Sequence, residues 1–166
     1  MLQRGIQAAA PAQSVAWDVR RIEGPFCPVL DLLRPFGAAA QSRLSLSSPA
    51  SGPQVTVGDA VRVVETSPRP PAFVILDWFG NDGSVHHVHV VPADASTLTA
   101  EWKAQVPLGA QLITIVTSAE TLLQKDRPVQ ELAAAYLKDL QSALDQARSH
   151  DARVTADVMS IEVTRH

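Results

Sequence analysis

The chain has 166 residues, 46% of them hydrophobic and 19% charged, which is enough to bury a single core. A net charge of −3 and the scatter of its 14 lysine and arginine residues argue against a nucleic-acid partner. No apolar run has the length of a membrane span or a secretory signal, and the single cysteine, Cys27, excludes an internal disulfide. We therefore expect a soluble domain in a reducing compartment such as the cytoplasm.

The N-terminal part predicts a linker, a strand and a short helix. Residues 1–13 are small and rich in alanine and are interpreted as a linker, so the single domain is expected to span 14–166. Residues 15–19 alternate apolar and polar side chains, which is the period of a half-buried strand. Residues 28–35 place apolar side chains at helical spacing between two prolines, which favours a short helix.

The next part of the chain predicts short strands separated by turns. Residues 37–53 are rich in alanine, serine, glycine and proline, and only the RLSLS stretch within them alternates enough to pair as a strand. Two β-branched runs then follow, one through Val55 and Val57 and one through 61–64, with a turn at Gly58-Asp59 between them. This spacing is typical of an antiparallel sheet.

The stretch PAFVILDWFGNDGSVHHVHVVP predicts a β-hairpin. Asp82-Gly83 is a strong turn signal, because glycine adopts the positive φ that such a turn needs. The arms are then residues 73–79 and 84–91. If Phe79 lies opposite Ser84, each later pair of residues is fixed in turn.

This register decides what the hairpin histidines can do. It places Asp77 opposite His86 on one face and puts His87 and His89 on the other, so the three histidines cannot converge on one ion. His87 and His89 supply at most two ligands, and a zinc site needs a third from elsewhere. An Asp77–His86 pair across the strands is the expected role of His86. The candidate binding surface of the hairpin comprises Asp77, Trp78, His86, His87 and His89.

The C-terminal half predicts a buried strand, a long helix and a final strand. Residues 112–116 are apolar on nearly every position, as expected of a central strand covered on both faces. A helix is expected from near Pro128, with an apolar stripe that faces the core. In the last strand the alternation slips phase, which a β-bulge near Val158 would explain. The stripe comprises Val129, Leu132, Tyr136, Leu140 and Leu144.

These elements predict a mainly β chain with α (α+β): an antiparallel β-sandwich with a short N-terminal helix and one long C-terminal helix. No G-x-G-x-x-G, P-loop or G-x-S-x-G motif occurs in the sequence. Cys27 could act as a nucleophile only if a histidine reached it in space, and a lone cysteine beside an apolar helix is more often a small buried hydrophobe. We expect no enzyme activity in this chain and no cofactor.

Two long stretches carry a family resemblance. GDAVRVVETSPRPPAFVILDWFGNDGSVHHVHVVP and PLGAQLITIVTSAETLLQKDRPVQELAAAYLKDLQSAL together resemble the domain of unknown function at the C-terminal end of some bacterial serine/threonine protein kinases and caspase-like proteins. That family has an aromatic-rich strand with an Asp, an Asp-Gly turn, a strand carrying a His, a PFG-x-x-L-I strand and an RP-x-x-E helix containing YL. The positions that correspond here are Asp77, Asp82-Gly83, His87, Pro107-Leu108-Gly109, Leu112-Ile113, Arg127-Pro128, Glu131 and Tyr136-Leu137.

The resemblance covers roughly residues 26–144 and departs from the family at Leu108, where phenylalanine is usual, and in the extra histidines His86 and His89. It implies a non-catalytic regulatory or protein-interaction module with a protein partner, and it supplies no catalytic residues. No kinase motif is present in this sequence, so any kinase would lie elsewhere in a parent chain. The alternative is a small-molecule or metal-binding β-sandwich domain that uses His87 and His89.

Overall fold

The computed structural model describes residues 24–37, 43–47, 53–66, 73–88, 91–92, 97–123 and 127–165. The predicted linker, the predicted strand at 15–19 and His89 lie outside the described residues. The helices are α1 (Cys27–Leu33), the short 3-10 helix η1 (Arg34–Phe36) and α2 (Ala133–Ser149). The strands are β1 (Arg43–Ser47), β2 (Gln54–Thr56), β3 (Ala60–Thr66), β4 (Phe73–Phe79), β5 (Ser84–Val88), β6 (Val91–Pro92), β7 (Thr97–Lys103), β8 (Gly109–Ser118), β9 (Gln130–Leu132) and β10 (Val154–Thr164).

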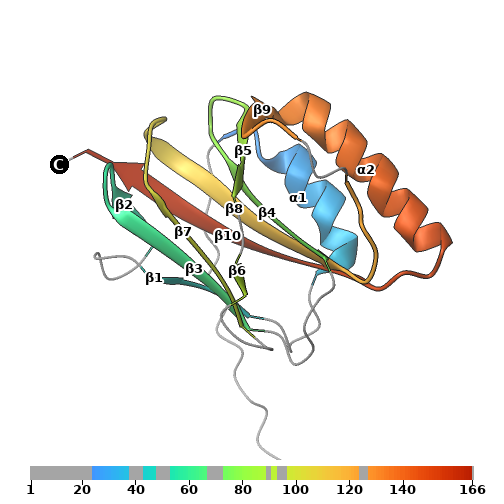
Figure 1. The fold of residues 1–166 in the computed structure, drawn as a ribbon. Helices are drawn as coiled ribbons and strands as arrows, with labels where there is room; N and C mark the ends of the chain where they lie inside the picture. The colour runs from blue at the N-terminus through green and yellow to red at the C-terminus, as the bar shows by residue number, and fades with distance from the viewer. Residues whose placement is uncertain are drawn as a thin grey trace, which may run out of the picture.

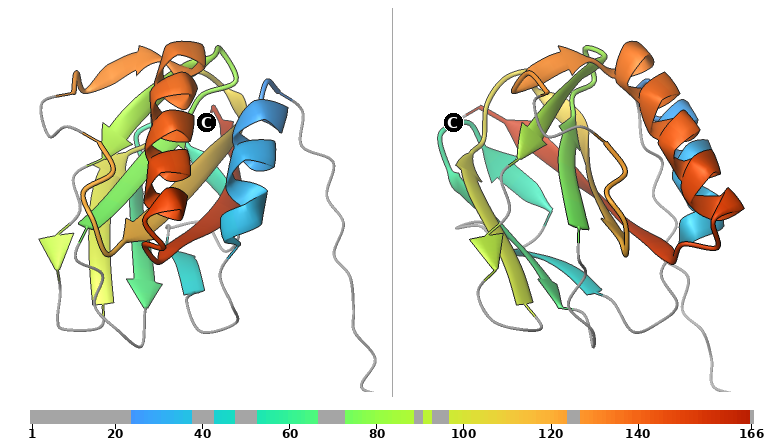
Figure 2. Two further views of the ribbon diagram at one scale, coloured as in Figure 1. Left: turned by 90° about the vertical axis from the view of Figure 1, so that its right-hand side faces the viewer. Right: turned by 45° about the vertical axis from the view of Figure 1, so that its right-hand side comes forward.

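The strands form two sheets. One has the order β2-β10-β8-β4-β5-β9 and the other β1-β3-β7-β6. All pairs are antiparallel except β10 with β2. Helices α1 and α2 lie side by side on the face of the larger sheet that is turned away from the smaller one (Figures 1 and 2). The expectation of a mainly β chain with two α-helices is confirmed.

The larger sheet is buried on both faces at its centre. Strand β8 lies between β10 and β4, and its residues 111–118 are all buried, so the predicted central strand is confirmed. Leu112 and Val116 belong to the core beneath the helices. Ile113 and Ile115 belong to the core that the two sheets share. The near-continuous apolar sequence of β8 follows from this double coverage.

The last strand has no bulge, which corrects the prediction near Val158. Strand β10 pairs with β8 residue for residue, from Val154 opposite Ser118 to Val163 opposite Gly109. Its apolar side chains change face instead: Ala156 packs in the core beneath the helices, whereas Ile161 packs in the core between the sheets. The phase slip in the sequence marks the point where the covering layer changes.

The predicted register of the β4–β5 hairpin is wrong by one residue. The Gly80 N–H donates to the carbonyl of Ser84, and the Gly83 N–H donates to the carbonyl of Gly80, so the loop has three residues. Phe79 therefore lies opposite Val85 rather than Ser84. Gly83 does adopt the expected positive φ, at 82°. A one-residue change of register moves every side chain of an arm to the other face.

The predicted start of the long helix is also wrong. Residues 130–132 form the edge strand β9, and α2 begins at Ala133, whose N–H donates to the carbonyl of Gly83. Val129 and Leu132 are 77% and 71% exposed, so they do not belong to the core stripe. The rest of the stripe is confirmed, because Tyr136, Leu140 and Leu144 are buried.

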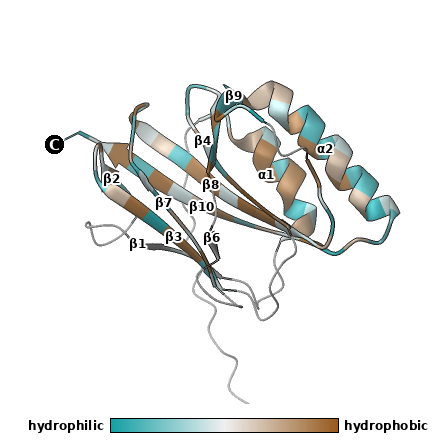
Figure 3. Ribbon diagram, in the orientation of Figure 1, coloured by the Kyte–Doolittle hydropathy of each residue, from teal (hydrophilic) through white to brown (hydrophobic). Residues whose placement is uncertain are grey.

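The two helices differ in polarity. Hydrophobic residues dominate α1, whereas hydrophobic and hydrophilic residues alternate along α2 (Figure 3). This alternation fits a helix with one face on the sheet and one in solvent. Among the residues that the structure describes, no helix is long and apolar enough to cross a membrane.

Candidate functional site

A buried carboxylate lies on the helix side of the larger sheet. Side chains alternate along β4, so Asp77 shares a face with Ile75 and Phe79, which pack in the core beneath the helices. Asp77 is only 1% exposed. The observed register places His87 directly opposite Asp77, so both side chains point towards α2. A buried carboxylate needs hydrogen-bond donors, and this position has them.

Two donors serve the Asp77 carboxylate. Oδ1 lies 2.7 Å from Nδ1 of His87. Oδ2 accepts a hydrogen bond from the Tyr136 hydroxyl, which α2 brings down onto the sheet. The ring of Tyr136 also meets the His87 ring edge to face, with 4.8 Å between the centroids. Residues from β4, β5 and α2 are therefore joined at one point.

The polar contacts continue outwards from His87. Its Nε2 lies 2.9 Å from Oε1 of Glu131 on β9. The Arg127 guanidinium donates to both oxygens of Glu131, at 2.7 and 2.8 Å, and to Asp139 of α2 at 3.1 Å. Charges of opposite sign alternate along this chain of contacts. We refer to Asp77, His87, Tyr136, Glu131, Arg127 and Asp139 as the Asp77 network.

Burial and charge shift the pKa values in the Asp77 network. Burial raises the pKa of the Asp77 carboxyl, although His87 and Tyr136 hydrogen bond to it. Burial lowers the pKa of the His87 ring, but its hydrogen bonds and the negative charges of Asp77 and Glu131 outweigh that effect, so the pKa is raised. The hydrogen bond from Arg127 lowers the pKa of Glu131. The Asp77–His87 pair therefore keeps a proton at higher pH than the isolated groups would.

The contacts of His87 limit its chemistry. An ionised carboxylate only accepts hydrogen bonds, so a protonated His87 donates from both ring nitrogens to its carboxylate partners. A general base or a metal ligand needs a ring nitrogen with a free lone pair. A neutral His87 has one such lone pair, but the nitrogen that carries it faces Asp77 or Glu131, so a ligand there would have to displace a carboxylate. The described residues contain no group of three or more histidine, cysteine, aspartate or glutamate side chains placed to hold a metal ion.

The predicted surface residues divide between two faces of the sheet. Asp77 and His87 lie together in the Asp77 network. Trp78 is buried on the opposite face, where the centroid of its ring lies 5.4 Å from the centroid of the His86 ring. The expected Asp77–His86 pair is therefore wrong, because His86 lies opposite Trp78. His89 lies outside the described residues, and the cysteine proposed as a conditional nucleophile is exposed at the start of α1.

Sequence reasoning assigns no polar role to four members of the network, Arg127, Glu131, Tyr136 and Asp139. Arg127 and Glu131 occur only at positions of the family resemblance, and Tyr136 occurs both there and in the predicted apolar stripe. Arg127 and Glu131 have the spacing of an ion pair on a helix, and the sequence predicts a helix from near Pro128. In the structure the same pair forms where the chain enters β9, so it connects an edge strand to α2.

A cavity of about 260 Å³ adjoins the Asp77 network. Its polar wall consists of Asp77, His87, Arg127 and Tyr136 with Thr121, and the rest of its lining is apolar. Because the polar groups of the network already bind one another, they are not free to bind a ligand in this cavity. The network is therefore best explained as a support that fixes β9 and α2 on the sheet.

The raised pKa of His87 predicts a pH-dependent stability. A raised folded-state pKa means that the protonated ring stabilises the fold. That contribution is complete below about pH 6.5, the value of an unfolded histidine, and is lost as the pH rises through the folded pKa. We expect the free energy of unfolding, measured with urea, to fall as the pH rises above about 6.5. His87→Gln should flatten this fall.

His86→Gln is the matched control. Burial lowers the pKa of His86, so its contribution to stability grows as the pH approaches 6.5 from below and is then constant. The fall above about pH 7 should persist in this variant. Parallel curves for the wild type and His87→Gln would contradict the assignment.

Comparisons with known proteins identify no family for this chain. No family model matches it, and no curated protein does. A crystal structure of a DUF4785 family protein from Legionella pneumophila is a distant structural neighbour, with 7% sequence identity and a TM-score of 0.46. The match covers 75% of this chain and 29% of that protein, so the chain spans less than a third of the neighbour's length. A likeness at this level is not evidence of a shared family or function.

Proposed function

We propose that this chain is a non-catalytic regulatory or protein-interaction module of the β-sandwich class. It acts in the cytoplasm as part of a bacterial signalling protein such as a serine/threonine kinase. The resemblance to kinase-associated domains and the engaged state of both His87 nitrogens support a binding role over a catalytic one. One surface feature carries the proposal.

That feature is an exposed apolar edge. Strand β9 is the edge strand of the larger sheet. Val129 immediately precedes it and Leu132 is its last residue, and 77% and 71% of their surfaces are exposed. Edge strands present unpaired backbone groups, and partner proteins commonly add a strand or a loop there. The Asp77 network holds β9 through Glu131, so the edge is fixed before a partner arrives. A preformed surface loses less entropy on binding.

The experiment is a binding measurement with a partner identified by crosslinking in bacterial cells. The purified partner should lose at least about tenfold in affinity for the double variant Val129→Glu, Leu132→Glu, because charges replace apolar contact area. Val106→Glu is the matched control, since Val106 is 64% exposed and lies in the β7–β8 connection. It should bind like the wild type. Equal loss in both variants, or no loss in the double variant, would refute the proposal.

The alternative of a metal or small-molecule site at His87 and His89 has less support. The two nitrogens of His87 face Asp77 and Glu131 at 2.7 and 2.9 Å. A ligand at His87 would have to displace one of these carboxylates. Metal content after purification, with melting in the presence and absence of a chelator, tests that alternative.

A further inference from the structure

A second cavity lies between the two helices and the β4–β5 turn. Its volume is about 400 Å³, within the range of small-molecule sites. Gly83 at the turn and Ala133 and Ala134 at the start of α2 carry no large side chain, and a Cβ at Gly83 would meet nothing within 4 Å. The lining residues are Pro25, Phe26, Pro28, Val29, Leu32, Phe79, Gly80, Gly83, Ala133, Ala134, Leu137, Lys138 and Gln141.

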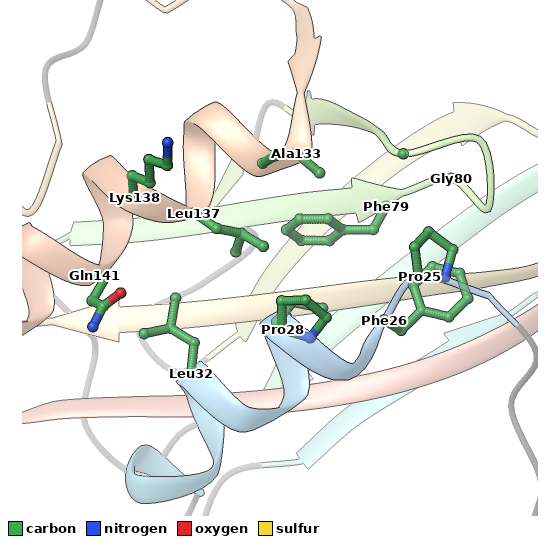
Figure 4. Close-up of a pocket in the computed structure, with 13 residues that line it drawn as sticks. Pro25, Phe26, Pro28, Leu32, Phe79, Gly80, Ala133, Leu137, Lys138 and Gln141 are labelled. Atoms are coloured by element: carbon green, nitrogen blue, oxygen red, sulfur yellow. The ribbon is translucent and has the colours of Figure 1, made fainter.

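The cavity is apolar along most of its length. Phe79 lies at its centre, with Leu137 of α2 beside it, and Pro25 and Phe26 form one end (Figure 4). Leu32 and Leu137 are only half-buried, although both pack against the core beneath the helices. Water in contact with such walls is released when an apolar ligand enters. The shape and lining favour an aliphatic chain.

The opposite end of the cavity is polar. Lys138 and Gln141 lie three residues apart on α2, and Figure 4 shows both at the end away from Pro25. The Lys138 ammonium points away from Phe79 there, but Lys138 is exposed and its flexible four-carbon stem lets the ammonium turn to the cavity. Among the residues that line the cavity, Lys138 alone carries a charge. Its ammonium group and the Gln141 amide both donate hydrogen bonds. The group that complements this end is an anion that accepts hydrogen bonds.

We propose that this cavity binds a linear aliphatic monocarboxylate. The carboxylate lies at Lys138 and Gln141, and the chain runs past Leu137 and Phe79 towards Phe26. A single cation selects a single negative charge, and the apolar remainder disfavours a second polar group on the chain. This site goes beyond the proposed protein contact at Val129 and Leu132 and does not depend on it.

The test is a calorimetric titration of the full chain with hexanoate, octanoate and decanoate. One ligand should bind per chain, and affinity should rise about fourfold for each added methylene, as expected for burial of aliphatic carbon. Leu137→Trp should abolish binding, because the indole fills the centre of the cavity. Leu32→Trp blocks the opposite wall and serves the same purpose if the first variant does not melt cooperatively.

The polar end is tested separately. Lys138→Gln should weaken decanoate binding about three- to tenfold and leave 1-decanol binding unchanged, because only the carboxylate meets the cation. Lys103→Gln, on β7, is the matched control and should bind decanoate like the wild type. No binding, binding that persists with the cavity filled, or equal effects of Lys138→Gln on acid and alcohol would overturn the proposal. The partner affinity of the Val129→Glu, Leu132→Glu variant is an independent result.

Discussion

An aspartate in place of Ile115 is expected to leave the chain without a cooperative melting transition. Ile115 lies at the centre of β8, 2% exposed, directly opposite Leu76 of β4. Both side chains pack in the core between the two sheets. An unpaired carboxylate there costs several kcal/mol, against a total stability of about 5–15 kcal/mol for a domain of this kind. Leu76→Asp should have the same effect, for the same reason.

The measurement is circular dichroism on heating, with Ile115→Val as the matched control. Valine removes one methylene from the same place without adding charge, so it should cost only about 0.5–1.5 kcal/mol and keep a cooperative transition. A cooperative melt of Ile115→Asp near the wild-type temperature would mean that the core between the sheets does not depend on this position.

The sequence contained the information for the elements whose environment is uniform along their length. Residues 112–116 are apolar at every position but Thr114, because β8 is covered by helices on one face and by a sheet on the other. Gly83 indicated the turn because its conformation is a local property. The bulge predicted in β10 is wrong because the layer that packs on this strand changes along its length. Such a change shifts the phase of the apolar pattern in the same way as a bulge.

The candidate site could not be predicted because it depends on register and on contacts between distant segments. The Asp-Gly signal fits loops of several lengths, and one residue of difference decides whether His86 or His87 faces Asp77. Pairing with β5 converts residues 130–132 from the expected helix into β9. Glu131 thereby reaches His87, a contact between residues 44 positions apart. Tertiary contacts override local propensity at such positions.

Asp77→Ala is expected to destabilise the chain by about 3–5 kcal/mol, because it removes one partner of a buried, hydrogen-bonded charge pair. His87 would lose the acceptor of its Nδ1 hydrogen, and the Tyr136 hydroxyl would lose its partner at a fully buried position. The measurement is the free energy of unfolding in urea at a fixed pH near 7. Asp139→Ala is the control at the exposed end of the Asp77 network, and it should cost no more than about 1 kcal/mol.

A combined variant distinguishes the net free energy of unfolding that the contacts contribute from the free energy that is lost when one partner is missing. In Asp77→Leu, His87→Leu, Tyr136→Phe, no buried group of the inner network is left without its partner, while Arg127 and Glu131 still bind each other. Replacing a buried polar group and its partners by apolar side chains together is often neutral or stabilising. The triple variant should therefore be more stable than Asp77→Ala, although it carries more substitutions. It should also lose the fall in stability above about pH 6.5, because the histidine responsible for that fall is gone. A triple variant less stable than Asp77→Ala would show that the network contributes net stability rather than a defined position for β9 and α2.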